Sequence, residues 1–281
     1  MASKRQPIRQ RIHDFTEGTP PSRGEVPYLA LTRAQENGHG EAGPGRVFRV
    51  ATYNVHRWAG IRGGRAWVPE KASAVIAELD AGVIALQEVL RPFDGSKPLE
   101  ALAERFGFHL AFVCTRMHQR GELGNAILSR WPIVTACAVD LTFGRLEQRA
   151  AIAAQFRTSE GEGVFSIAAT HLALVDRTRR RQVEALLEHP QLQGPVILLG
   201  DMNAWRRGAA SRQLDEAFTT RHHNRDWPPS FPSMRPVLAL DRAYARKARI
   251  LSLRAHNSAT SRRGSDHLPV IATVALEDQG E

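Results

Sequence analysis

The sequence predicts an α/β fold in which two stacked β-sheets are flanked by helices. Three observations support this prediction. Apolar, strand-like segments clearly outnumber helix-like segments over residues 47–275. The few helix-like segments do not give the regular alternation of a purely parallel sheet. The chain has 281 residues, of which 42% are hydrophobic, and this is enough material for a sizeable core.

The first expected elements follow from apolar periodicity and from the residues that flank it. Residues 47–54 are typical of a buried strand that ends at Asn54. Pro69 suits the first position of a helix that ends before Gly82. Residues 83–87 form a short apolar strand, with Glu88 just beyond its end. A helix over 98–106 should end at Gly107.

The rest of the chain continues mainly as strands. His171 lies at the end of one of them, and Asp176 is a candidate cap for a helix over 177–189. The remaining strands are expected at 108–114, 125–129, 133–143, 149–157, 164–170, 196–199, 237–245, 248–255 and 269–275.

Residues 1–45 differ from the rest in composition. They contain Pro20–Pro21, several glycines and little apolar periodicity, so we expect a flexible or loosely docked basic arm before a catalytic domain over 46–281. The first eleven residues hold four basic side chains and no acid, which fits either a phosphate-binding arm or a solvated tail.

The chain is strongly basic, with a formal net charge of +9. Removing residues 1–45 leaves 32 basic and 24 acidic residues, or +8, so the basicity belongs to the predicted catalytic domain. A basic surface attracts nucleic acid, acidic membranes and small phosphates alike. An Arg- and Ala-rich chain also follows from a GC-rich genome, so charge alone does not choose among these partners.

No targeting or membrane-spanning segment is apparent. No apolar run reaches the roughly 20 residues of a membrane helix, and the basic start lacks the apolar stretch of a secretory signal. We therefore expect a cytoplasmic protein, and no protein partner is inferred. Cys114 and Cys137 lie in apolar strand contexts and match no metal or redox spacing, which predicts two buried free thiols.

Polar residues fall at the ends of the apolar strands. Strand ends that share one sheet edge can converge on a single cleft, where rigid strands hold such groups well. Glu88, Asp266 and the amide oxygen of Asn54 are hard oxygen ligands of the kind that Mg²⁺ prefers. There is no zinc-type cluster, no phosphate-binding glycine loop and no serine-hydrolase elbow. The residues at these positions are Asn54, Glu88, His171, Asp201 and Asn203, with Asp266 and His267 just before the last strand.

Seven short segments occur in one order and resemble the endonuclease/exonuclease/phosphatase superfamily, which includes DNase I, AP endonucleases and sphingomyelinases. They are TYN (52–54), LQE (86–88), GNAILSRWPI (124–133), THL (170–172), GDMN (200–203), LDR (240–242) and SDH (265–267). The resemblance covers residues 47–276. It implies a four-layer αββα sandwich of two mixed β-sheets, a Mg²⁺ site that could also take Mn²⁺, and in-line attack of water on a phosphate ester.

The resemblance also implies roles for particular positions. Glu88 corresponds to the main metal ligand, with Asn54 and Asp266 nearby. Asp201 would orient or deprotonate the attacking water, and Asn203 and His171 would donate to phosphoryl oxygens. Asp241 would orient His267, which contacts the phosphate or transfers a proton. Whether Asp201 or His267 is the effective base, and whether one metal or two are used, stays open.

Several other residues are candidates for substrate contact. Asn125 either lines the cleft or begins a strand, and Arg149 interrupts an apolar strand start. Arg206 and Arg207 directly follow GDMNAW, whereas Arg177 and Arg179–Arg181 fit a phosphate approach or a solvated helix face equally well. Trp205 could stack on a base or pack in the core. His56 stands where AP endonucleases carry an acidic residue, which argues against that activity.

The predicted reaction is hydrolysis of a phosphodiester, and the net charge favours nucleic acid as substrate over phospholipid. Residues 231–238, FPSMRPVL, are the one candidate for an apolar loop that would contact lipid. The alternatives are a phospholipid or sphingomyelin-type phosphodiesterase, a small-molecule phosphatase, and a binding module that has lost catalysis.

Overall fold

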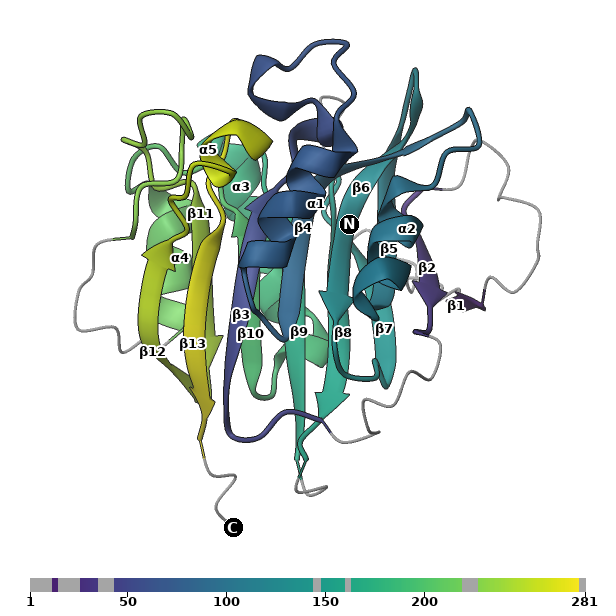
Figure 1. Cartoon of the computed structure of the whole chain (residues 1–281). Coiled ribbons are helices and arrows are strands. Elements are labelled where there is room, and N and C mark those ends of the chain that lie inside the picture. The colour runs from purple at the N-terminus through teal and green to yellow at the C-terminus, as the bar shows by residue number, and fades with distance from the viewer. Residues whose placement is uncertain are drawn as a thin grey trace, which may run out of the picture.

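The computed structural model contains two mixed β-sheets stacked face to face (Figure 1), and it describes residues 12–14, 26–34, 43–143, 148–159, 163–218 and 227–277. The strands of the larger sheet, in spatial order, are β1 (Ile12–Asp14), β2 (Tyr28–Thr32), β5 (His109–His118), β6 (Gly121–Ser129), β4 (Val83–Pro92), β3 (Val47–Asn54), β13 (Val270–Leu276) and β12 (Ala248–Ala255). Those of the smaller sheet are β11 (Asp241–Arg246), β10 (Val196–Asp201), β9 (Val164–His171), β8 (Ala150–Arg157) and β7 (Thr135–Asp140).

Helices cover the outer face of each sheet (Figure 1). α1 (Pro69–Glu78) and α2 (Pro98–Phe106) pack on the larger sheet, and α3 (Asp176–Glu188) and α4 (Ala209–Ala217) pack on the smaller one. A third apolar cluster fills the space between the sheets and includes Phe48, Phe165 and Ile197. The predicted αββα sandwich is therefore confirmed. The short elements are α5 (Ser261–Gly264), η1 (His56–Trp58), η2 (Gly60–Arg62) and η3 (Pro190–Leu192).

Local sequence explains the ends of the predicted helices. Pro69 and Pro98 begin α1 and α2, where the missing amide hydrogen costs nothing. Gly107 ends α2 in the left-handed conformation, with φ of 65°, which a glycine adopts without strain. Leu99 and Leu102 face the sheet and are buried, so α2 is held by its apolar face.

Some expected elements differ from the observed ones, and three differences have a local cause. β4 does not end at Gln87, because a bulge between Leu86 and Val89 lets it continue to Pro92. α4 was not predicted, since its nine residues carry only a short apolar stripe. Asp176 is the first residue of α3 and does not cap it; its carboxylate instead accepts a hydrogen bond from the amide of Ala209, at the start of α4.

Part of the predicted N-terminal arm belongs to the larger sheet. β2 pairs antiparallel with β5, and Tyr28, Leu29 and Ala30 are buried. This apolar run is only five residues long and lies between polar segments, so its periodicity is too short to be distinctive in the sequence. The basic residues Lys4, Arg5, Arg9 and Arg11 lie outside the described part of the chain.

Among the described residues, none of the helices has the length and apolar character that crossing a bilayer requires.

Candidate active site

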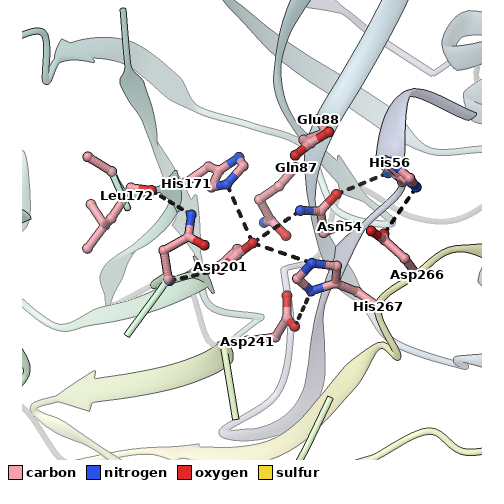
Figure 2. A network of polar contacts seen from close by, with 12 residues as sticks. Asn54, His56, Gln87, Glu88, His171, Leu172, Asp201, Asp241, Asp266 and His267 are labelled. Atoms are coloured by element: carbon pink, nitrogen blue, oxygen red, sulfur yellow. Dashed lines mark hydrogen bonds and ion pairs between the residues drawn. The ribbon is translucent and has the colours of Figure 1, made fainter. Parts of the chain in front are cut away.

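Strand register places the predicted residues at one end of the sandwich. His171, Asp201 and Asp241 are direct neighbours on the adjacent strands β9, β10 and β11 of the smaller sheet. Asn54 ends β3 in the larger sheet, in register with Gln87 of β4. These strand ends of the two sheets face each other, so residues far apart in the sequence meet in one cluster (Figure 2).

Asp201 is the centre of this cluster and is buried. Its Oδ2 accepts a hydrogen bond from Asn54 Nδ2 at 3.1 Å and lies 3.4 Å from His171 Nε2 and 3.8 Å from His267 Nε2. Its Oδ1 accepts the backbone amide of Asn203 at 2.9 Å. One carboxylate therefore contacts an amide, two imidazoles and a backbone donor from four segments of the chain.

His267 joins Asp201 to a second buried carboxylate. His267 Nδ1 lies 2.7 Å from Asp241 Oδ2, which also accepts the Ser230 hydroxyl at 2.6 Å. The backbone amide of Asp241 donates back to the same hydroxyl at 3.2 Å. The imidazole is thus held in one orientation, with Nε2 facing Asp201. The predicted pairing of Asp241 with His267 is present in this geometry.

Hard oxygen donors occupy the other side of Asn54. Its side chain donates to Asp201, while its Oδ1 faces the opposite way and accepts the backbone amide of His56 at 3.0 Å. His56 Nδ1 lies 3.2 Å from Asp266 Oδ1, and Arg57 Nε lies 3.4 Å from Glu88 Oε2. Glu88 and Asp266 retain side-chain exposures of 26% and 29%, so both carboxylates are open to a ligand from solvent.

The backbone around these oxygen donors is strained. Glu88 has φ of 52° within the β4 bulge, and His56, Arg57 and Trp58 form a left-handed turn with φ of 46°, 56° and 61°. Each such non-glycine residue costs roughly 1–3 kcal/mol, and this kind of strain clusters at functional sites. Trp58 is buried, and its Nε1 donates to the Leu90 carbonyl at 2.7 Å, which anchors the turn on β4.

The electrostatic environment separates the ionisation states of the central groups. Burial and the neighbouring Asp241 raise the pKa of Asp201 to about 6, against the opposing effect of His267. Burial lowers the pKa of His267, but the Asp241 charge and hydrogen bond, with Asp201 and Asp266, outweigh it and raise that pKa to about 10. Burial, Arg149 and His267 hold the pKa of His171 well below its ordinary value. His267 is therefore an imidazolium at neutral pH and His171 a neutral imidazole.

The predicted substrate-contact residues fall into different places. Arg149 is close enough to depress the pKa of His171, which puts a positive charge beside the cluster. Asn125 is buried in β6 and donates from Nδ2 to the Ala150 carbonyl of the other sheet at 2.8 Å. Arg206 and Arg207 are exposed on the β10–α4 loop, where Arg207 pairs with Asp215 of α4 at 3.0 Å.

Arg179 shows that the arginine-rich start of α3 is not one uniform face. Its guanidinium is buried and donates to the carbonyls of Ala173, Leu174 and Asn203 at 3.0, 2.5 and 2.8 Å. It thereby holds together the two loops that carry His171 and Asn203. The side-chain amide of Asn203 donates to the Leu172 carbonyl at 2.8 Å, which fixes the residue at φ of 48°.

Three residues of this site were not predicted from the sequence: Ser230, Ser265 and Arg57. Ser265 donates to the Asn54 carbonyl at 2.7 Å, and its position beside Asp266–His267 was an available signal. Arg57 follows Asn54 closely enough that chain position alone would have justified weighing it. Ser230 depends on how a loop folds back, and the sequence carried no signal for it. Arg179 was weighed only as a phosphate contact or a solvated residue, and its buried bonds to backbone carbonyls correspond to neither.

The fold and this cluster together define a class of protein: αββα sandwiches of the DNase I-like fold whose polar residues gather at one end of the paired sheets. Comparison with known families agrees. The model of the Endonuclease/Exonuclease/phosphatase family matches residues 51–267, and the chain belongs to this family.

Relatives and solved structures are consistent with that membership. The Escherichia coli (strain K12) "Uncharacterized protein YbhP" is 29% identical over 248 residues, covering 82% of this chain and 96% of that protein. The human nocturnin catalytic domain with bound sulfate has a TM-score of 0.65 at 22% identity, covering 83% of this chain and 96% of its own. The Bacteroides thetaiotaomicron mannosyl-6-phosphatase Bt3783 has a TM-score of 0.67 at 16% identity, covering 82% and 100%. At these identities the solved structures show the shared fold alone.

Proposed function

We propose that this protein is a Mg²⁺-dependent phosphodiesterase that hydrolyses its substrate by in-line attack of water. The observation that carries the proposal is the buried chain Asp241–His267–Asp201–Asn54, which ends beside two partly exposed carboxylates, Glu88 and Asp266. Such an arrangement places groups that transfer protons next to groups that bind a hard cation. Each of these contributes to cleavage of a phosphate ester at neutral pH.

The donor set fits a divalent metal. Glu88, Asp266 and Asn54 Oδ1 offer oxygen ligands of the type that Mg²⁺ and Mn²⁺ take, and the two carboxylates are partly exposed. When bound there, the ion would neutralise charge on the phosphate ester. A second set, Asp201, Asp241 and His267, has ligand atoms within 4.8 Å of one another. Because His267 Nδ1 is already bound to Asp241, we assign that set to proton transfer and not to the metal.

The chain's own groups divide the remaining work. Asp201 is the carboxylate placed to orient water and accept its proton, since Asn54 and Asn203 hold both of its oxygens. His267, protonated and fixed by Asp241, would donate a hydrogen bond or a proton to a phosphoryl oxygen. Neutral His171 and the nearby positive charge of Arg149 would stabilise the negative charge that grows in the transition state.

The substrate class is a finer question than the reaction. Net charge favours nucleic acid, whose phosphates bind arginines in a salt-dependent way. Exposed apolar residues around the site favour a phospholipid. A small-molecule phosphoester is a third possibility, and a non-catalytic binding module is disfavoured by the complete residue set.

The test is an assay on bis-p-nitrophenyl phosphate, plasmid DNA, RNA and phospholipid vesicles, with Mg²⁺ or with EDTA. Hydrolysis should require the metal. Glu88→Ala should weaken Mn²⁺ binding in calorimetry, whereas Glu104→Ala, which removes an exposed carboxylate from α2, should not. Full turnover in EDTA, or unchanged Mn²⁺ affinity in Glu88→Ala, would remove the metal from the proposal.

A further inference from the structure

The end of the sandwich that carries the candidate active site exposes several large apolar side chains. Leu174 and Trp205 are each 61% exposed, and Val237 is 66% exposed. They lie on loops at the end of the sandwich where β9 and β10 end and β11 begins, whereas Leu251 lies on strand β12. We name this set the apolar rim; it consists of Ile61, Leu174, Val175, Trp205, Met234 and Val237.

Each rim loop also exposes arginine. Ile61 is followed by Arg62, Trp205 by Arg206, and Met234 by Arg235, while Arg177 lies just after Val175. Residues 56–68, 172–178, 202–208 and 227–240 together contain a single acid, Asp176, and it is paired with Arg179 at 3.1 Å. Positive charge and apolar surface are thus interleaved around the site.

Hydrogen bonds hold the loops of the smaller sheet together as one surface. Arg179 joins the Leu174 and Asn203 carbonyls, and Arg242 donates to the carbonyls of Ala204 and Ala239. The same loops carry the catalytic candidates. Residues 172–175 follow His171, residues 202–208 follow Asp201, and the amide of Ser233 donates to the Asp266 carbonyl at 2.7 Å. A partner that lies on the rim therefore also lies over the active site.

We propose that the apolar rim docks on an anionic phospholipid bilayer, so that the site acts on phosphate esters of lipid head groups. The hydrolytic part rests on the function proposed above. Aliphatic side chains gain free energy when buried among acyl chains, Trp favours the membrane interface, and Arg favours anionic head groups. A phosphate-tracking nucleic-acid groove uses arginine and aromatic side chains but gains little from exposed Leu, Val and Met.

The test measures co-sedimentation of the full chain, in Mg²⁺, with vesicles of phosphatidylcholine alone or mixed with phosphatidylglycerol. We expect binding to the anionic vesicles at low salt. The double variant Leu174→Ser/Val237→Ser should bind them about tenfold or more weakly, as expected for loss of part of two apolar burials. Arg62→Gln/Arg235→Gln should lose about fivefold per arginine. Leu251→Ser is the matched control and should bind like the wild type.

Hydrolysis of soluble bis-p-nitrophenyl phosphate separates docking from chemistry. It should be the same in all three variants, because none of the substituted residues belongs to the catalytic cluster or to the predicted substrate contacts. The docking surface would be overturned if the protein did not bind anionic vesicles, or if Leu251→Ser lost as much vesicle binding as the rim variants. It would also be overturned if Leu174→Ser/Val237→Ser lost duplex DNA binding but kept vesicle binding. Vesicle binding that depends on the rim, without hydrolysis of any phosphodiester, would support docking and overturn the hydrolase.

Discussion

At the scale of single residues, the proton-transfer chain depends on which groups are buried together. The Asp241 carboxylate makes His267 a persistent imidazolium, because its charge and hydrogen bond outweigh the cost of burial. Asp201, buried against the same imidazole, keeps a carboxyl group whose pKa of about 6 lies just below neutrality. The site therefore holds a proton acceptor and a proton donor at the same pH.

The first prediction concerns the Asp241–His267 pair. In the metal-free protein, the His267 imidazole should titrate at about 10 by NMR, and Asp241→Asn should lower that pKa strongly. Since the folded pKa is raised, the pair stabilises the fold fully below about pH 6.5 and progressively less as pH rises toward 10. A wild-type His267 that titrates near 6.5 would contradict the pairing.

The same pair should act as a unit in catalysis. Asp241→Asn and His267→Ala should each lower kcat, and the double variant should lose much less than the product of the two single losses. Multiplicative losses would mean that the two residues act independently.

The second prediction concerns Asp201. Asp201→Asn preserves size but removes the proton acceptor, so kcat should fall by roughly 10³-fold or more. Asp140→Asn, which changes an exposed carboxyl group at the end of β7, should leave kcat unchanged. If kcat fell only slightly in Asp201→Asn, another group would be the base.

These residues also show how far sequence reasoning reaches. Asn54, His171 and Asp201 were predictable because each ends a buried apolar strand, where a polar side chain has no packing purpose. The contact of Ser230 with Asp241 and that of Arg57 with Glu88 depend on loop conformations, the latter on three consecutive left-handed residues. Such conformations leave no periodic pattern in the sequence.

At the scale of secondary-structure elements, α3 supports the site through one buried side chain. Arg179→Met should lower the free energy of unfolding by about 1.5–3 kcal/mol, the usual worth of hydrogen bonds from a charged donor, and should lower kcat by releasing Asn203. Arg180→Met removes an exposed ion pair with Glu184 and should cost less than about 1 kcal/mol. If Arg179→Met and Arg180→Met changed urea unfolding and turnover equally, Arg179 would contribute no more than an exposed arginine.

Strands β5 and β7 bury the two cysteines, as the sequence predicted. Burial raises the pKa of Cys114 to about 12 and that of Cys137 to about 11, so almost no thiolate forms near neutral pH. Neither thiol should react with Ellman's reagent in the native protein, and both should react in urea. Rapid labelling of one thiol without denaturant would show that its strand opens locally.

At the scale of the whole molecule, the core between the sheets sets the relative position of the two halves of the site. Phe165 packs there against Phe48 and Phe156, with ring centroids 5.3 and 5.5 Å apart. Phe165→Ala should cost about 3–5 kcal/mol and should also lower kcat well below the unfolding temperature. Leu102→Ala empties space outside the larger sheet and should destabilise without that loss. Equal kcat in both variants would show that sheet alignment is not limiting.

The hydrogen bond from Asn54 to Asp201 crosses from one sheet to the other, as does that from Asn125 to the Ala150 carbonyl. Most of the interface around them is apolar and non-directional, so directional polar links such as these two restrict sliding of one sheet on the other. Divergence among relatives could therefore retune turnover through interior residues that never approach a substrate. In this chain, substitutions that change the shape of interior aromatic side chains such as Phe48 and Phe165 should therefore change the catalytic rate.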